Sequence, residues 1–181
     1  MILRGLIFFF FLPVLLTPGF VQGQEEFDHM IKVETLTFEW RLAGESLHVM
    51  LSAKTKGWVG IGFNPSKEMK DGNFILGYVK KGKVTISDHF GFTARQHKSD
   101  TKLGGKKNVS DAWGAEEGGR TAIRFTIPLN SGDDKDREIF INKDNLVLLA
   151  HGAGRDSLKG KHKFKTVLKV NLQTGVYEKL K

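Results

Sequence analysis

The chain contains 181 residues, with 28 lysine and arginine residues against 20 aspartate and glutamate residues, a net charge of +8 and no cysteine. The lack of cysteine excludes a disulfide scaffold, a thiolate metal site, a cysteine nucleophile and covalent attachment of c-type haem. The positive charge can attract an acidic protein partner or belong to a solvated strand face. The lysines are not interleaved with aromatic residues as single-stranded nucleic acid requires, so we expect no nucleic-acid partner.

The first residues have the pattern of a secretory signal peptide. Arg4 is followed by the apolar run LIFFFFLPVLL, and the small residues of VQG precede Gln24. This pattern predicts a cleaved signal peptide over residues 1–23 and export of the chain, either secreted or periplasmic. The alternative is an N-terminal membrane helix, but two prolines interrupt the apolar run. We expect residues 24–181 to form one domain with no membrane span after cleavage, because no later apolar run is long enough.

The rest of the chain alternates apolar and polar residues with a period of two, and no long helical pattern is present. Such alternation is typical of strands with one buried face. Short strands with glycine-rich turns predict an all-β fold, an antiparallel β-sandwich without a domain linker. The expected strands cover residues 36–42, 47–51, 57–63, 73–79, 83–88, 121–127, 146–150 and 162–172. The polar segment 91–119 is left unassigned.

The run GWVGIGF carries the first candidate for a binding surface. Alternation places Trp58, Gly60 and Gly62 on one strand face, and the apolar residues that end with Phe63 on the other. A face with two glycines lets a flat group approach the backbone closely. The pattern leaves open whether that group is a ligand or a tightly packed neighbouring strand.

Met69 and His162 are the candidate metal ligands. Met69 lies in the polar loop NPSKEMKDG, where its side chain is either a packing plug or a sulfur ligand. His162 begins the last long strand, and alternation with Phe164 predicts that it points inward, as a core histidine or as a ligand. A thioether and an imidazole together would fill both axial positions of a haem iron, which favours electron transfer over oxygen binding. His151 is the reserve ligand.

Other chemistry has weaker support in the sequence. Asp133, Asp134 and Asp136 could offer oxygen ligands to calcium, but they lack the order of a recognised calcium loop, so a solvated turn is favoured. No nucleophile motif, phosphate-binding loop or pair of catalytic carboxylates is evident. We therefore expect a protein that is not itself an enzyme.

Six segments in order resemble a DOMON domain, the family named after the N-terminal region of dopamine β-monooxygenase, which includes the cytochrome domain of cellobiose dehydrogenase. Together they span about residues 33–172. They are GWVGIGFNPSKEM, GNFILGYV, KVTISD, GGRTAIRFTIPLNSGDDKD, LVLLAHGAG and KHKFKTVLKVNL. The resemblance implies an immunoglobulin-like β-sandwich that holds haem b non-covalently between loops at one end. It implies Met69 and His162 as axial ligands, with Lys161 or Lys163 as the alternative seen in some relatives.

A cytochrome role makes further demands on the residues. Arg155, Lys159 or Lys161 could pair with the haem propionates. An apolar slot for haem would be formed by the glycine-bearing strand and by aromatic walls, namely Trp58, Gly60, Gly62, Phe63, Phe74 and Phe164. The basic surface would then meet an acidic redox-partner protein.

Two alternatives remain open. Other members of the family bind no haem and are thought to recognise sugars, in which case Trp58 or Trp113 would stack on a carbohydrate or another small ligand. The chain could also be an accessory subunit that delivers haem electrons within an exported molybdenum enzyme complex.

Overall fold

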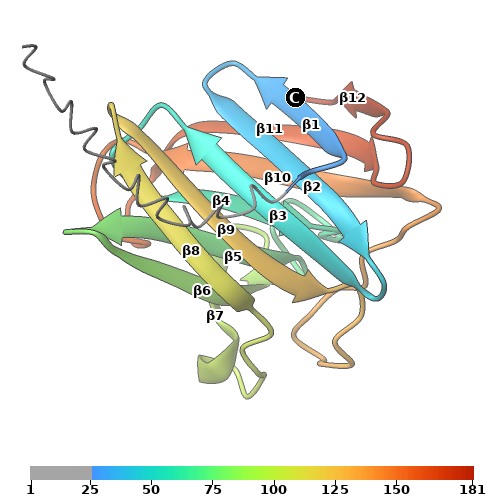
Figure 1. Ribbon diagram of the computed structural model, residues 1–181. Helices are drawn as coiled ribbons and strands as arrows, with labels where there is room; N and C mark the ends of the chain where they lie inside the picture. The colour runs from blue at the N-terminus through green and yellow to red at the C-terminus, as the bar shows by residue number, and fades with distance from the viewer. Residues whose placement is uncertain (1–25) are drawn as a thin grey trace, which may run out of the picture.

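Two antiparallel β-sheets form nearly all of the structure, a computed structural model that describes residues 26–181. The predicted signal peptide lies outside the described residues. Figure 1 shows the sheets stacked as two layers, with the five-stranded sheet in front. The predicted all-β antiparallel sandwich is confirmed, and its two layers are compatible with an immunoglobulin-like arrangement. Within the described part, no helix has the length and apolar character needed to cross a membrane.

The five-stranded sheet has the order β1-β2-β3-β9-β8 and the seven-stranded sheet the order β12-β11-β10-β4-β5-β6-β7. A single 3-10 turn, η1, follows β7. The bounds are β1 His29–Val33, β2 Leu36–Ala43, β3 Ser46–Ala53, β4 Val59–Phe63, β5 Asn73–Lys80, β6 Lys83–Thr93, β7 Gln96–Ser99, η1 Asp100–Lys102, β8 Ser110–Glu117, β9 Arg120–Pro128, β10 Asp144–Gly152, β11 His162–Asn171 and β12 Tyr177–Lys179.

The core lies between the two sheets and follows from the period-two alternation. In β2 and β3 the residues that face the other sheet are buried, and those between them are only partly covered. Trp40 is fully buried, and its indole N–H donates to the Leu172 carbonyl at 2.8 Å, so a large apolar ring is buried without leaving its polar atom unpaired. Each fully buried large side chain contributes roughly 1.5–3 kcal/mol through the hydrophobic effect.

The unassigned segment 91–119 forms the end of β6, then β7, η1 and β8. Most residues of β8 are exposed, because it is the edge strand of the five-stranded sheet. An edge strand with two wet faces has no apolar alternation, which explains why the sequence pattern did not predict it.

The central strand β4 differs from its neighbours because all five of its residues are buried. Its inner face contributes to the core between the sheets. Its outer face is covered by a second apolar cluster, which is separate from that core. A sheet face that points away from the sandwich is normally solvated, so this covered outer face is the candidate location of a functional site.

Candidate functional site

The second apolar cluster, here called the outer cluster, lies on the outer face of the seven-stranded sheet. Trp58, Phe74 and Leu76 form its centre and are only 6%, 7% and 4% exposed. In β5, Phe74 and Leu76 alternate with Ile75, which belongs to the inner core, and Trp58 directly precedes β4. Partly buried residues from the neighbouring strands and from two loops pack against this centre, namely Met69, Tyr78, Leu148, Ala150 and Leu158.

The glycines of β4 accommodate side chains of the outer cluster. A Cβ added at Gly62 would overlap the ring of Phe74, and one added at Gly60 would lie 3.1 Å from Cγ of Leu76. The flat group that approaches the backbone is therefore the protein's own Phe74 ring. Of the two readings left open by the sequence, tight packing between strands is the one the structure adopts. A ligand on this face would rest on Phe74 and Leu76, not on the glycine backbone.

Met69 is held at the edge of the outer cluster by backbone contacts of its loop. Its N–H donates to the Ala94 carbonyl at 3.2 Å, and its carbonyl accepts the Gly72 N–H at 3.2 Å. The loop is also tied to β6, because the Asp71 N–H donates to the Gly91 carbonyl at 2.6 Å. The half-buried side chain of Met69 packs against the outer cluster. The Met69 thioether thus lies on an apolar surface, and hydrogen bonds hold the Met69 backbone at both its N–H and its carbonyl.

His162 does not point inward as alternation with Phe164 predicted, because a β-bulge shifts the register of β11 at this point. The shift pairs His162 with Gly152, and the imidazole is exposed. Residues directly opposite each other project to the same sheet face. A Cβ at Gly152 would overlap Trp58, so this is the face of the outer cluster. Among residues 26–181, no hydrogen bond to the His162 ring is found, which leaves its nitrogen atoms available.

Met69 and His162 therefore share the outer face but lie toward opposite ends of β4. Met69 follows Phe63, the last residue of β4. His162 lies beside the β10 residues that pair with Val59, the first residue of β4. The pairing register of four strands places both side chains on this face. Their separation along β4 could not be predicted from the sequence.

The aromatic residues predicted as walls of one slot divide between two faces. Trp58 and Phe74 belong to the outer cluster, whereas Phe63 is fully buried in the inner core and Phe164 packs against that core. The structure thus does not bring these four rings into one pocket, because neighbouring positions in a strand project to opposite faces. Arg155 is exposed in the loop that precedes β11, and its backbone lies close to Gly57.

His151, the reserve ligand, is a core histidine with its polar atoms satisfied. Its ring is buried and stacks on Phe164, with centroids 5.6 Å apart. Nε2 lies 3.1 Å from Oγ1 of Thr35, and Nδ1 lies 3.0 Å from the carbonyl oxygen of Gly152. Both nitrogen atoms are engaged, so this imidazole is not available to a metal.

A pair of histidines beside the outer cluster was missed by the sequence reasoning. The Nδ1 atoms of His89 and His97 lie 2.8 Å apart, and His97 stacks on Phe74 with centroids 5.6 Å apart. Burial, together with the positive charge of a protonated His97 and of Lys102, lowers the pKa of His89 to about 4, and burial also lowers the pKa of His97. Both rings are neutral at pH 7, and one donates to the other. Only the pairing of β6 with β7 brings them together, so their spacing in sequence carries no signal.

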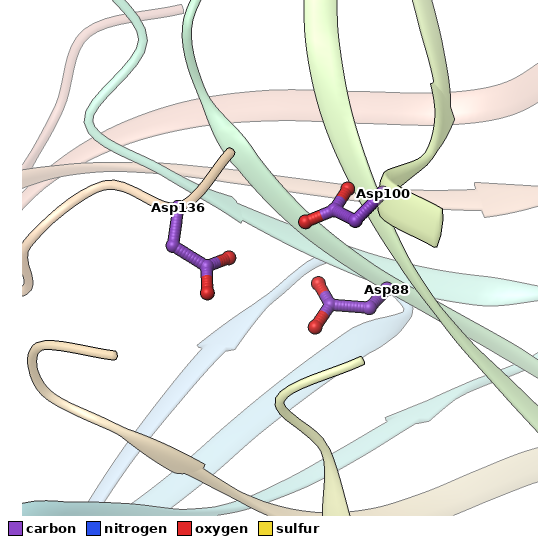
Figure 2. A group of neighbouring side chains, drawn as sticks. All are labelled: Asp88, Asp100 and Asp136. Carbon is purple, nitrogen blue, oxygen red and sulfur yellow. The ribbon is translucent and has the colours of Figure 1, made fainter. Parts of the chain in front are cut away.

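Three aspartates from distant segments meet at the edge of the sandwich, on the inner side of β6. Figure 2 shows the carboxylates of Asp88, Asp100 and Asp136 directed toward one another. One oxygen of each lies within 4.8 Å of the others. Burial raises the pKa of Asp88 to about 7 and that of Asp100 to about 8, and it also raises the pKa of Asp136. We call this group the aspartate cluster.

The aspartate cluster differs from the group that the sequence suggested. Asp136 belongs to it, but Asp133 instead accepts the backbone N–H groups of Lys106 and Lys135. Asp134 is exposed. The two other members of the cluster lie far away in sequence, on β6 and η1, and no local motif connects them.

The two sheets and the outer cluster define a β-sandwich domain, and comparison with known proteins gives its family. The model of the DOMON domain family matches residues 32–152, so the chain belongs to this family. Human DBH-like monooxygenase protein 1 is 28% identical over 100 residues, which are 55% of this chain and 16% of that protein. The MOXD1 homolog 2 of Drosophila melanogaster is 24% identical over 128 residues, which are 70% of this chain and 16% of that protein.

The chain thus spans about a sixth of the length of the curated relatives it matches. Among solved structures, the cytochrome b domain of pyranose dehydrogenase from Coprinopsis cinerea superposes with a TM-score of 0.60 and 12% identity, covering 77% of this chain and 78% of that domain. The cytochrome domain of Myriococcum thermophilum cellobiose dehydrogenase gives a TM-score of 0.49 at 9% identity, with 73% and 72% covered. The first of these likenesses supports the sandwich fold.

Proposed function

We propose that this DOMON domain is an exported b-type cytochrome domain that relays single electrons, with haem b held on the outer cluster by Met69 and His162. The observation that carries the proposal is the outer cluster itself, an apolar surface outside the core with a thioether at its edge and an unbonded imidazole on the same face. The name of the pyranose dehydrogenase domain adds support, since that protein is a cytochrome b domain.

The donor set fits haem b in its chemistry. Met69 offers a soft sulfur atom on an apolar surface, and His162 offers a nitrogen atom that no other group among residues 26–181 engages. Trp58 and Phe74 are buried, and they would offer apolar area to a flat macrocycle only once the loop that covers them moves aside. When bound, haem supplies a one-electron iron couple, and Met/His ligation raises its potential.

The positions of the two donors set a condition for binding. Met69 and His162 lie toward opposite ends of β4, so ligation of one iron by both requires the loop of residues 153–161 and the start of β11 to move across the sheet. That loop contributes Leu158 to the cover of the outer cluster. The indole N–H of Trp58, buried beneath it, has no acceptor in this arrangement. An unpaired buried donor disfavours the present position of the loop, which makes its displacement less costly.

The surface around His162 supports the propionate and partner roles. Arg155 and the neighbouring lysines are exposed, and they can pair with propionates or with an acidic redox protein. The lysines are Lys159, Lys161, Lys163 and Lys165. We expect association with such a partner to slow as salt is raised.

An absorption spectrum of the purified chain with haem, oxidised and then reduced with dithionite, tests the proposal. We expect a six-coordinate low-spin spectrum. Met69→Ala and His162→Ala should each convert it to a high-spin or water-ligated form, whereas Met30→Ala, at an exposed position in β1, should leave it unchanged. Loss of the spectrum in Lys161→Ala or Lys163→Ala, but not in His162→Ala, would assign the second ligand to lysine. A preparation that stays colourless with ample haem would refute the cytochrome role.

The alternative of a haem-free domain that binds a sugar depends on one tryptophan, Trp113. Trp58 is buried in the outer cluster and cannot stack on a sugar from solution. Trp113, which is 42% exposed on β8 with the Arg124 guanidinium 5.7 Å from its ring centre, can do so. A saturable change in tryptophan fluorescence with glycans, lost in Trp113→Ala, would favour this binding role.

A further inference from the structure

The aspartate cluster places three carboxylates in a buried position with too few hydrogen-bond donors. Asp88 and Asp100 are 2% and 0% exposed. Both carboxylate oxygens of Asp100 lack a hydrogen bond, as do Oδ1 of Asp88 and Oδ1 of Asp136. Buried carboxylates without partners are costly, and three together repel one another. Such a group needs either protons or a cation.

We propose that Asp88, Asp100 and Asp136 bind one calcium ion, which joins β6 and η1 to the loop between β9 and β10. The carboxylate oxygens come from three segments and converge on one point (Figure 2). Their separation, within 4.8 Å, is inside the roughly 5 Å that divides ligands on opposite sides of a calcium ion. This site would bind calcium whether or not the domain holds haem.

The available donors are those of a hard cation. The Asn108 backbone N–H donates to Asp88 at 2.8 Å, and Oδ1 of the same residue is buried with no hydrogen-bond partner among the described residues. Asp88 and His89 are consecutive in β6 and project to opposite faces, so the imidazole lies outside the cluster. An all-oxygen set with carboxylate, amide and water ligands suits calcium and not zinc or copper.

The remaining bonds leave the cluster free to take a cation. Asp136 accepts a hydrogen bond from Ser131 at 2.5 Å and Asp88 accepts one from Asn108, so each keeps its other oxygen for the ion. Nζ of Lys135, the nearby cation, lies 5.7 Å from the ring centre of Phe90. Burial is the main cause that raises the pKa values of Asp88 and Asp100, and the charges of neighbouring aspartates raise them further, whereas Lys135 lowers the pKa of Asp100 only in part.

Bound calcium would also brace the strand that supports Met69. Asp88 lies three residues before Gly91, whose carbonyl accepts the Asp71 N–H of the Met69 loop. Fixing β6 on its inner side therefore stiffens the segment on which this loop rests.

Calcium chloride titrated into chelator-treated full-length protein at pH 8 tests the proposal, with binding heat and melting temperature as readouts. We expect saturable heat and a higher melting temperature. Asp100→Asn should lower the affinity at least tenfold and remove the temperature shift, yet melt at or above the calcium-free wild-type temperature, because one buried charge is gone. Asp134→Asn, exposed in the same loop as Asp136, is the matched control and should behave as wild type.

Asp136→Asn, at a half-buried position, should lose the calcium response as well. If Asp100→Asn does not fold, this second variant tests the calcium site. The proposal is overturned if wild-type protein shows neither heat nor a temperature shift at about 5 mM calcium, above the range of weak extracellular sites. It is also overturned if Asp136→Asn retains wild-type affinity, or if magnesium binds more tightly than calcium.

Discussion

Met69 and Gly91 are in such close contact that Gly91 has no room for a side chain, since a Cβ there would overlap the Met69 carbonyl. The Met69 loop therefore rests directly on the backbone of β6. This contact links the position of the candidate sulfur ligand to the strand that carries Asp88 and His89.

Gly91→Ala should displace the Met69 loop. We expect a loss of about 1–3 kcal/mol in the free energy of unfolding, because backbone atoms must shift to admit the methyl group. Urea denaturation measures the loss. Gly160→Ala is the control, since a Cβ there would meet only ordinary contacts at 3.5 Å or more. Equal stability of the two variants would show that the loop does not need close contact with β6.

Gly62→Ala should destabilise the protein through the Phe74 ring that covers it. We expect a loss of about 1–3 kcal/mol from the overlap. Phe74→Ala alone should lose about 3–5 kcal/mol from the emptied outer cluster. In the double variant the loss should be clearly smaller than the sum, because the ring that caused the overlap is absent. If the losses measured by urea denaturation are additive, Gly62 and the Phe74 ring do not interact.

Calcium-free protein should lose stability as pH rises from about 6.5 to about 8, above the range in which the histidine pair titrates. The pKa values of Asp88 and Asp100 are about 7 and about 8 in the folded state, against 3.8 for an unperturbed aspartate carboxyl group. The folded state therefore binds more protons than the unfolded state between about pH 4 and about pH 8. The stability due to those protons falls as pH rises through this range and levels off above the folded pKa values. Urea unfolding at several pH values with chelator measures the slope.

Asp100→Asn should flatten this slope, because one of the two groups no longer titrates. The other groups near the cluster are Asp136, Asp133 and Lys135, and they remain in the variant. Stability that increases with pH over this range in the wild type would contradict the assigned pKa values.

The histidine pair should contribute a loss of stability on the acid side. The pKa of His89 is about 4 in the folded state against 6.5 for an unperturbed imidazole, and burial also lowers the pKa of His97. The unfolded state therefore binds more protons below pH 6.5, and stability falls as pH drops from about 6.5 toward 4. NMR titration of the ring protons measures this directly. A titration midpoint of His89 near pH 6.5 would mean that the His89 and His97 rings are exposed to water.

Strand positions and the sandwich were predictable because period-two alternation is a local property of the chain. The predicted strands all correspond to strands of the structure, although β1, β7, β8 and β12 were missed. Those four are the edge strands of the two sheets, where one-sided burial is weak or absent. The sequence also pointed to the Met69 loop, since an apolar thioether in a polar loop requires a packing partner.

The assignment of side chains to faces depended on details that alternation does not contain. A bulge in β11 turned His162 to the outer face, and Phe74 and Leu76 covered the glycines that were expected to meet a ligand. One inserted residue reverses the face of a side chain, so a parity argument fails at the first bulge.

The sequence by itself determined an antiparallel β-sandwich of the DOMON type and the residue types available for chemistry, because local patterning decides which segments become buried strands. Only the tertiary structure decided that Asp88, Asp100 and Asp136 meet, and that His89 pairs with His97 beside Phe74. The reason is physical. Strand pairing and loop packing bring distant residues together, and the register of that pairing is set by the whole sheet.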